Sequence, residues 1–311
     1  MTYNRCELLL EAVDAVLRQT HPVDRLLVID NASTDGTSEA FLGRDDVEYV
    51  RLEANLGGAG GFARAVELAR DGTSDWIWLM DDDAEPVPDS LERLLAAAAA
   101  ADASTAALCS TVQYASGGID ANQRGHFRRR LRPLSQAEYR DGHHPAIGFL
   151  SFVGSLVRTD VARSEALPRA DFFVWGDDVE YSFRLRRHGE IRLVPESVIL
   201  HKRETHAYAT PRSRVVNRLL PVTLHPTPIE RFWMNLCGLR NYLWTKRVYE
   251  RQSALSAVGT TAQFVAKHVL IDDHPLARIR WIVRFARDGR AGRFVNIAPS
   301  EWVRMVREGL V

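Results

Sequence analysis

The sequence contains very little lysine and few cysteines. Only three of its 40 basic residues are lysines, at Lys202, Lys246 and Lys267, and its three cysteines lie far apart. The 40 Lys and Arg residues are balanced by 40 Asp and Glu, so a general nucleic-acid binder is not expected. Widely separated cysteines lack the spacings of a zinc site or a disulfide framework, which indicates a reducing compartment.

Long hydrophobic runs are absent as well. The longest apolar stretch, residues 94–101, is mostly alanine and is far shorter than the roughly 20 residues of a membrane-spanning helix. No signal peptide precedes it. We therefore expect a protein that is cytoplasmic, or that attaches to a membrane only from the side. With 46% hydrophobic residues, the 311-residue chain can still form a folded core.

The first half of the chain alternates short apolar runs with helical patterns, as βα units do. Residues 7–18 have apolar side chains at helical spacing. Strands are predicted at residues 25–30, 47–52 and 76–80. The first ends on Asp30 and the third runs into residues 81–83, where open α/β sheets bind ligands. The fold class is thus α/β, with a mixed sheet between helices.

One strand is missing from this pattern. A doubly wound sheet normally begins with a central strand, but residues 1–5 are turn-like and lead directly into a helix. Either the sheet lacks its first strand, or the true start of the protein lies upstream of Met1, and we favour the second interpretation.

The pattern changes at about residue 147. The apolar run 147–157 predicts a buried strand, residues 179–187 a helix, and residues 191–194 and 198–200 two short strands. We predict a catalytic domain at residues 1–206, a loop or flap rich in Pro, Thr and Arg at 207–229, and a helical region at 230–311.

Residues 76–83 read Trp-Ile-Trp-Leu-Met-Asp-Asp-Asp, the strongest chemical signal in the chain. Three adjacent carboxylates at a strand end repel one another unless a cation lies among them. Oxygen ligands of this kind suit Mg²⁺ or Mn²⁺. The alternative is a solvated acidic turn before the helix that starts near Asp89.

Four glycines lie between a strand and a helix, at Gly57, Gly58, Gly60 and Gly61. They allow the backbone to approach a ligand closely, and the following helix start favours an anion or an acceptor oxygen. The spacing differs from that of a dinucleotide-binding loop, and a plain glycine-rich turn is the alternative.

Four further polar residues are candidates. Asp30 either accepts a hydrogen bond from a base or makes an Asx turn. Asp177 and Asp178 follow aromatic residues at a helix start, where a carboxylate is either a general base or part of an ordinary helix cap. His201 ends a strand and is a candidate metal ligand only because of the carboxylates elsewhere in the sequence.

Taken in order, these motifs resemble the family 2 inverting glycosyltransferases of GT-A fold. The resemblance spans roughly residues 1–205 and rests on residues 2–5, 30–37, 55–61, 81–83, 175–178 and 201. Within that family it is most similar to the actinobacterial galactofuranosyltransferases that initiate cell-wall galactan. Residues 231–242 are similar to the Tyr-x-x-Arg-Asn helix of those enzymes.

The resemblance implies a role for each motif. Mn²⁺ or Mg²⁺ would be held on the donor diphosphate by Asp81, Asp83 and His201. The base that deprotonates the acceptor hydroxyl would be Asp178. The remaining assignments place Asp30 on the uracil, Thr2, Arg5, Asn55 and Asp82 around the nucleotide sugar, and Asp177, Trp175 and the four glycines around the sugar and acceptor.

The implied reaction is transfer of galactofuranose from UDP-galactofuranose to a polyprenyl-diphosphate-linked rhamnosyl-GlcNAc acceptor. The resemblance also implies that the missing strand weakens donor binding. Phe152 and Val153 stand where chain-extending relatives have acceptor-side aromatics, which argues against a processive polymerase. Two alternatives are a rhamnosyltransferase that uses dTDP-rhamnose and a non-catalytic sugar-nucleotide-binding scaffold protein.

The segment 276–294 is basic and amphipathic. Its only acidic residue is Asp288, and it carries Trp281, Ile282, Val283 and Phe285 among Arg278, Arg280, Arg284, Arg287, Arg290 and Arg293. Such a helix either lies on an anionic bilayer or packs on the protein core. A lipid-linked substrate favours peripheral contact with the inner face of the plasma membrane.

Overall fold

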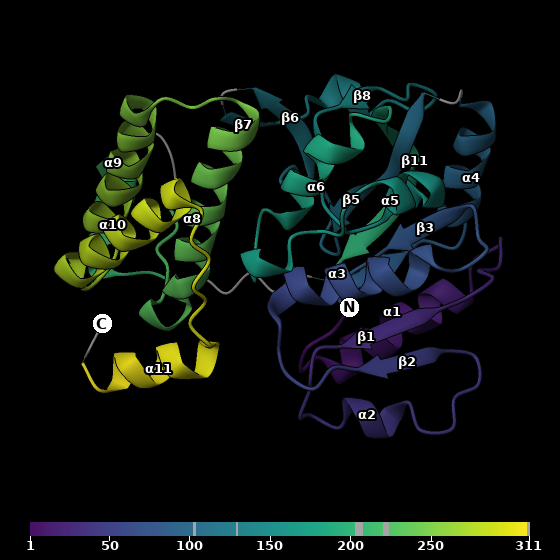
Figure 1. Ribbon diagram of the computed structural model, residues 1–311, viewed down its shortest axis with the longest axis horizontal. Helices are drawn as coiled ribbons and strands as arrows, with labels where there is room; N and C mark the ends of the chain where they lie inside the picture. Colours follow the sequence, from purple (N-terminus) through teal and green to yellow (C-terminus); the bar gives the residue numbers. More distant parts are fainter. Residues whose placement is uncertain (102–103, 129, 203–207, 220–223, 310–311) are drawn as a thin grey trace. The chain divides into compact units, whose positions relative to one another are not determined.

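The computed structural model describes residues 1–101, 104–128, 130–202, 208–219 and 224–309 (Figure 1). The chain forms two compact units, one of Met1–Ala170 with Asp177–Glu204 and one of Asp171–Gly176 with Thr205–Val311. The boundary predicted between residues 206 and 207 falls outside the described residues.

The helices of the first unit are α1 (Cys6–Leu17), α2 (Thr37–Ala40), α3 (Gly57–Arg70), α4 (Ser90–Ala100), α5 (Thr159–Ser164) and α6 (Asp177–Leu185). Its strands are β1 (Leu27–Asp30), β2 (Glu48–Arg51), β3 (Trp76–Leu79), β4 (Ala84–Pro86), β5 (Thr105–Tyr114), β6 (Arg124–Arg128), β7 (Arg130–Pro133), β8 (Ala146–Ile147), β9 (Phe149–Leu150), β10 (Ser155–Arg158) and β11 (Glu190–His201).

The main sheet has the order β3-β10-β5-β11-β4, and β8 pairs with β11 outside this path. It is mixed, because β11 runs parallel to β5 whereas β10 is antiparallel to both of its neighbours. A second sheet contains only β1 and β2, which are parallel. A third joins β7, β6 and β9. The predicted mixed α/β sheet is confirmed.

Helices cover both faces of the main sheet (Figure 1). Side chains of successive β3 residues point to opposite faces. On one face, Ile77 and Leu79 join a core with Phe62 of α3. On the other, Trp78 packs with Leu94 of α4. The sheet is therefore buried on both sides, and its polar residues are concentrated at the strand ends.

Three predictions of local structure need correction. Residues 57–61 form the first turns of α3 and are not a loop, because Gly57 adopts the left-handed φ of 74° that lets the chain turn into the helix. The apolar run 147–157 is divided among β8, β9 and β10. The two short strands predicted at 191–200 are one strand, β11, with a bulge between Val194 and Val198.

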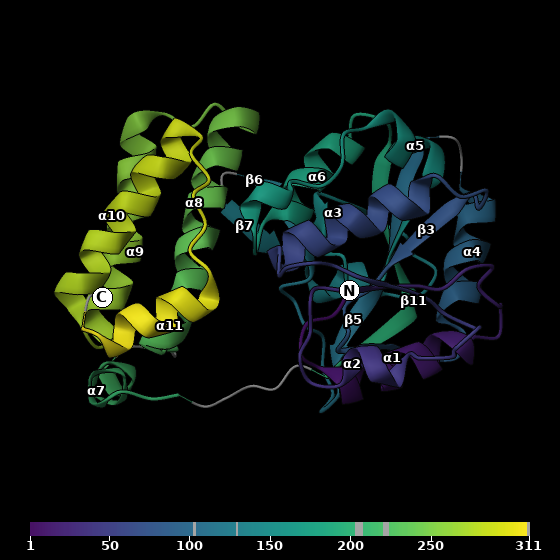
Figure 2. The same cartoon turned by 60° about the horizontal axis from the view of Figure 1, so that its bottom comes forward.

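The second unit is helical from residue 232 onwards, as predicted. It contains α7 (Pro211–Leu219), α8 (Phe232–Tyr249), α9 (Ala254–Ile271), α10 (Pro275–Ala291) and α11 (Pro299–Arg307). Helix α10 packs against both α8 and α9 (Figure 2), and its Ile282 packs with Phe232 of α8 and Trp302 of α11. Residues 207–229, predicted as a loop or flap, include the helix α7.

Candidate active site

The three carboxylates after β3 lie beside the first residues of the chain. The Thr2 hydroxyl donates to Asp82 at 2.8 Å, and an Arg5 guanidinium nitrogen lies 3.2 Å from Asp82 and 2.6 Å from Asp83. Asp82 and Asp83 are both buried, and Thr2 is fully buried. The structure thus brings Thr2 and Arg5, which the resemblance placed near the nucleotide, together with two of the three carboxylates.

His201 lies next to this group because of the strand pairing. It ends β11 opposite Ala84 of β4, the residue that follows Asp83. Its Nε2 is 3.3 Å from the Asp83 carboxylate, and both side chains are buried. The predicted juxtaposition of His201 with Asp83 is therefore observed.

Asp120 completes the group, and the sequence analysis did not find it. Its carboxylate accepts hydrogen bonds from His201 Nδ1 at 3.2 Å and from Gln123 and the Tyr114 hydroxyl, both at 3.0 Å. These donors hold the pKa of Asp120 far below its usual value despite partial burial. A carboxylate on one imidazole nitrogen fixes the ring and leaves the other nitrogen directed at Asp83.

The protonation of this group follows from burial and charge. Burial, together with the charges of Asp83 and Asp82, raises the pKa of Asp81 to about 7. Burial opposes the ionisation of Asp83, but the hydrogen bond and charge of His201, with those of Arg5, hold its pKa below the usual value. The hydrogen bonds to Asp120 and Asp83 outweigh burial and raise the pKa of His201 to about 9. The site therefore favours added positive charge.

The carboxylates after β3 and His201 are the candidate ligands of a divalent cation. Within the described ranges, no group of three His, Cys, Asp or Glu side chains is arranged to hold a metal ion. The ligand types nevertheless suit Mg²⁺ or Mn²⁺, because Asp83 and His201 face each other. Within the described part of the chain, no hydrogen bond reaches the Asp81 carboxylate. Arg5 supplies the positive charge next to Asp83 in this arrangement.

Asp177 and Asp178 begin α6 in the same unit. Burial raises the pKa of Asp178 to about 6. Burial and the neighbouring charges of Asp178 and Asp81 raise the pKa of Asp177 well above its usual value. The effect of Asp81 on the pKa of Asp177 links the pair to the carboxylates after β3.

Asp30 is fully buried at the end of β1, and its carboxylate bonds to the backbone of the turn that follows. It accepts from the Ser33 amide at 2.9 Å, and its other oxygen accepts from the Tyr49 hydroxyl. An Arg51 nitrogen lies 3.6 Å from the same carboxylate. Its contact with a base remains a prediction.

The glycines have packing roles that the sequence did not show. A Cβ on Gly61 would lie 2.5 Å from the Met1 side chain, and one on Gly60 would lie 2.4 Å from Leu56. Asn55 accepts from the Gly57 amide at 2.8 Å and from Asn31 at 3.0 Å, which ties the start of α3 to the end of β1. Close packing thus accounts for two of the glycines without an acceptor.

Trp175 belongs to the second unit and is 45% exposed. Its backbone has a left-handed φ of 63°, which is unusual for an aromatic residue. The Asn241 amide group of α8 donates to the carbonyls of Phe172, Val174 and Trp175, at 3.0, 3.1 and 2.9 Å. The Arg-Asn pair of residues 240–241 therefore holds the loop immediately before Asp177 in the sequence.

The fold is similar to that of a solved glycosyltransferase. The crystal structure of GalNAc-T7 with UDP, GalNAc and Mn²⁺ matches with a TM-score of 0.58 and 15% sequence identity, covering 91% of this chain and 52% of that chain. A mixed sheet with carboxylates at its strand ends is thus of the GT-A class, as expected.

Sequence comparison identifies the family. Residues 1–164, slightly more than half of the chain, match Glycosyl transferase family 2, and the chain belongs to this family. It is 34% identical over 200 residues to galactofuranosyltransferase GlfT1 of Mycolicibacterium smegmatis, and 30% identical over 194 residues to the protein of that name in Mycobacterium tuberculosis. Each alignment covers 61% of this chain and 64% of the relative, so the chain spans just under two thirds of these relatives.

Proposed function

We propose that the protein is a metal-dependent inverting glycosyltransferase that moves galactofuranose from UDP-galactofuranose to a polyprenyl-diphosphate-linked rhamnosyl-GlcNAc acceptor. The observation that carries this proposal is the contact of His201 with Asp83, two residues after Asp81, in the same unit as the carboxylates of Asp177 and Asp178. The name of the relatives, galactofuranosyltransferase, supports the choice of donor.

Asp178 acts as the general base. A carboxylate whose pKa is raised to about 6 is ionised at neutral pH, yet is basic enough to accept the proton of the acceptor hydroxyl as that oxygen attacks the anomeric carbon. Burial and the charge of Asp178 raise the pKa of Asp177 well above its usual value, so this carboxyl group favours the protonated form that can donate a hydrogen bond to the sugar. A single displacement of this kind inverts the anomeric configuration.

Mn²⁺ or Mg²⁺ would be held by Asp81, Asp83 and His201. The cation would stabilise the negative charge that develops on the departing diphosphate. Asp120 keeps the imidazole of His201 oriented for this role. The guanidinium of Arg5 would turn from Asp83 to the donor phosphates when the donor binds. We assign Asp30 to the uracil, Thr2, Asn55 and Asp82 to the nucleotide sugar, and Trp175 with the α3 glycines to the acceptor side.

The test of the donor is a parallel assay with UDP-galactofuranose and dTDP-rhamnose, a synthetic lipid-linked rhamnosyl-GlcNAc acceptor and Mn²⁺. Turnover with UDP-galactofuranose alone supports the proposal. Turnover with dTDP-rhamnose alone would assign the chain to the rhamnosyltransferases. A scaffold protein has no need of a base, so loss of turnover in Asp178→Asn with unchanged UDP binding would exclude that alternative.

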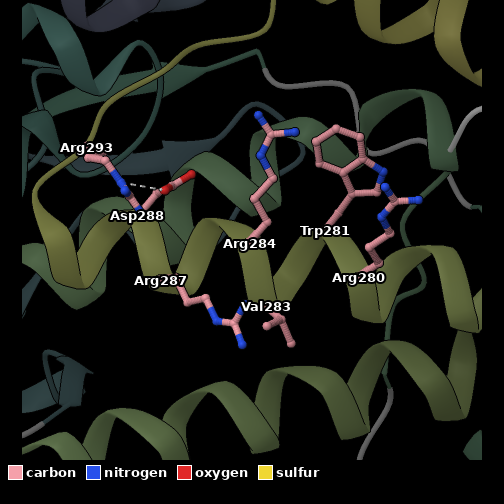
Figure 3. A pocket seen from close by; sticks show the side chains of 7 residues that line it. All are labelled: Arg280, Trp281, Val283, Arg284, Arg287, Asp288 and Arg293. Atoms are coloured by element: carbon pink, nitrogen blue, oxygen red, sulfur yellow. Dashed lines mark hydrogen bonds and ion pairs between the residues drawn. The ribbon is translucent and has the colours of Figure 1, made fainter.

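We further propose peripheral contact with the cytoplasmic face of an anionic membrane. None of the described helices has the length and hydropathy needed to cross a bilayer. A pocket of about 590 Å³ on α10 is lined by Arg280, Arg284, Arg287 and Arg293. Figure 3 shows Arg280, Arg284 and Arg293 projecting to one side of the helix and Arg287 to the other.

The structure corrects how this segment was expected to bind. Trp281, Ile282 and Phe285 are buried in the helical core and cannot enter a bilayer. Arg278 is also buried, in ion pairs with Asp272 and Asp273. Contact through α10 would thus be electrostatic. Apolar contact would come from α9, where Leu255, Val258 and Leu270 are 82%, 63% and 52% exposed.

A further inference from the structure

Three exposed arginines of α10 have no acidic partner. Within the described ranges of the chain, no ion pair or hydrogen bond involves the side chain of Arg280, Arg284 or Arg287. By contrast, the exposed Arg25 forms an ion pair with Glu48 at 2.7 Å. Like charges three or four residues apart on a helix repel one another, which destabilises the helix unless an anion neutralises them. The arrangement therefore favours a bound anion.

The pocket that these arginines line, here called the α10 pocket, has an excess of positive charge. Its charged lining residues are Arg280, Arg284, Arg287, Arg293 and Asp288, so four positive charges and one negative charge give a net charge of +3. The Asp288 carboxylate accepts from Arg293 Nε at 3.1 Å, and this pair is neutral. The net charge of the α10 pocket thus comes from the three arginines that have no acidic partner.

Trp281 holds one of these arginines in place. Its indole is only 8% exposed and packs edge to face on Trp302 of α11, with ring centroids 5.3 Å apart. The Arg284 guanidinium carbon lies 4.9 Å from the centroid of the Trp281 ring. A guanidinium on an aromatic face is fixed in position while its N–H groups remain able to donate. The stacking therefore prepares Arg284 to bind a ligand.

Arg280 lies one helical turn before Arg284. Figure 3 shows both side chains projecting from the same side of α10 as Trp281. Residues four apart on a helix have Cβ atoms about 5–6 Å apart, so two guanidinium groups at this spacing can bind adjacent groups of one ligand. Guanidinium groups bind phosphoryl oxygens through paired hydrogen bonds. The spacing thus suits a ligand that has two phosphoryl groups next to each other.

We propose that the α10 pocket binds the diphosphate group of the polyprenyl-linked acceptor, with one phosphoryl group on Arg280 and the other on Arg284. This inference rests on the proposed function, which supplies that acceptor. The acceptor diphosphate stays intact during transfer, so its site requires positive charge but no acid or base. Arg287 adds a third positive charge beside the two phosphoryl groups.

The rest of the lining limits the site to the headgroup. The apolar side chains in the α10 pocket are Trp281, which is buried, and Val283, which is half-buried. They offer little apolar surface to a polyprenyl chain, which would remain in the membrane. A ligand with a single carboxylate or phosphate would leave one of the two arginines without a partner. A diphosphate neutralises both.

The experiment measures binding to the 311-residue chain by calorimetry, in EDTA and at physiological salt. EDTA removes the divalent cation that the proposed donor site would use, so a diphosphate is not held there by metal. The probes are farnesyl diphosphate, inorganic pyrophosphate and farnesyl monophosphate. We expect both diphosphates to bind ~10-fold more tightly than the monophosphate, because the second phosphoryl group adds charge-assisted hydrogen bonds.

Paired variants test the residues. Arg280→Gln with Arg284→Gln should weaken farnesyl diphosphate binding ~100-fold, because two charge-assisted contacts are lost. Arg280→Lys with Arg284→Lys keeps the charge but removes the paired hydrogen bonds, so a loss of ~10-fold is expected. The matched control changes two exposed arginines of α11, Arg304→Gln with Arg307→Gln, and should bind like the parent chain. Thermal midpoints verify that each variant is folded.

Each contrary result has a definite meaning. An equal loss in the two glutamine pairs, or full binding by the lysine pair, would overturn the proposal in favour of general charge attraction. Monophosphate binding as tight as that of the diphosphates would also overturn it. UDP is the last probe, and if it binds the α10 pocket more tightly than farnesyl diphosphate, the ligand is a nucleotide and the assignment to the acceptor is wrong.

The transfer assay separates this inference from the proposed function. Turnover without diphosphate binding at α10 would overturn the α10 site alone. Diphosphate binding at α10 without turnover from UDP-galactofuranose or dTDP-rhamnose would instead contradict the proposed function, and the diphosphate site would stand.

Discussion

Asp120 and His201, 81 residues apart in the sequence, share a buried hydrogen bond of 3.2 Å at the end of β11. The other imidazole nitrogen of His201 faces Asp83 at 3.3 Å. A carboxylate behind a ligating histidine fixes its tautomer and strengthens it as a donor. This arrangement makes Asp120 a positioning residue for the proposed cation.

We predict that Asp120→Asn weakens Mn²⁺ binding ~10- to 100-fold, because the amide can present a donor to His201 Nδ1 and turn the ring. Titration followed by the Mn²⁺ EPR signal measures the affinity directly. The matched control is Tyr114→Phe, which removes a 3.0 Å hydrogen bond from Asp120 and leaves that to His201 intact. If both variants weaken Mn²⁺ binding equally, Asp120 merely supports its loop.

The pH dependence of transfer tests the proposed base. Because burial raises the pKa of Asp178 to about 6, the rate at saturating donor should rise with pH up to about 6 and level off above it. The rate is measured in the Mn²⁺ assay between pH 5 and pH 8. A rate that is flat across pH 6 while metal stays bound would rule out Asp178 as the titrating base.

The same carboxyl group should limit stability. Its pKa is higher in the folded than in the unfolded chain, so between about pH 4 and pH 6 the folded state holds a proton that the unfolded state has lost. Its contribution to stability is therefore present at low pH and lost as the pH rises through 6. Asp178→Asn should raise the thermal midpoint by ~2–4 °C at pH 8 and by less at pH 4.5. An equal shift at both pH values would mean that the carboxyl group does not titrate as assigned.

The loop before Asp177 offers a separate test. Asn241 donates to three carbonyls, of which that of Phe172 also accepts from Arg240, so Asn241→Ala removes three hydrogen bonds and should lower the free energy of unfolding by ~1–3 kcal/mol. The loss of order next to Asp177 should also lower kcat. Denaturant unfolding and the transfer assay measure the two effects. Asn235→Ala, on the same helix, is the control, and an equal loss there would assign the effect to α8 in general.

The sequence predicted the parts of the site that lie at strand ends. Asp81, Asp83 and His201 follow apolar runs, and the carboxyl ends of strands in such sheets meet at one place. Asp120 gave no such signal, since it follows the turn at Gly117 and its partner His201 is brought to it by the pairing of β5 with β11. Local periodicity does not predict long-range strand pairing of this kind.

In α10 the sequence pattern groups charged residues that the structure separates. Arg278 fits the basic stripe of the helix, yet it is buried because Asp272 and Asp273 are placed to neutralise it. Periodicity identifies the helix but does not tell which cations find partners in the core. The apolar side of α10 likewise packs on α8, so α10 has no apolar face that could enter a bilayer.

The electrostatic part of the membrane proposal can be tested with the exposed arginines of the α10 pocket. Each cation near an anionic surface contributes about 1 kcal/mol, so loss of two should weaken binding ~30-fold, and reversal of their charge should weaken it further. We predict this for the double variant Arg280→Glu and Arg284→Glu on vesicles with 30% phosphatidylserine, measured by co-sedimentation at low and physiological salt. Arg18→Glu, which reverses an exposed charge on α1 of the first unit, is the control and should bind like the parent chain. Equal binding by the parent chain, the double variant and Arg18→Glu would exclude the α10 pocket as the membrane contact. If Leu255→Glu weakens binding and the double variant does not, the membrane contact lies on α9.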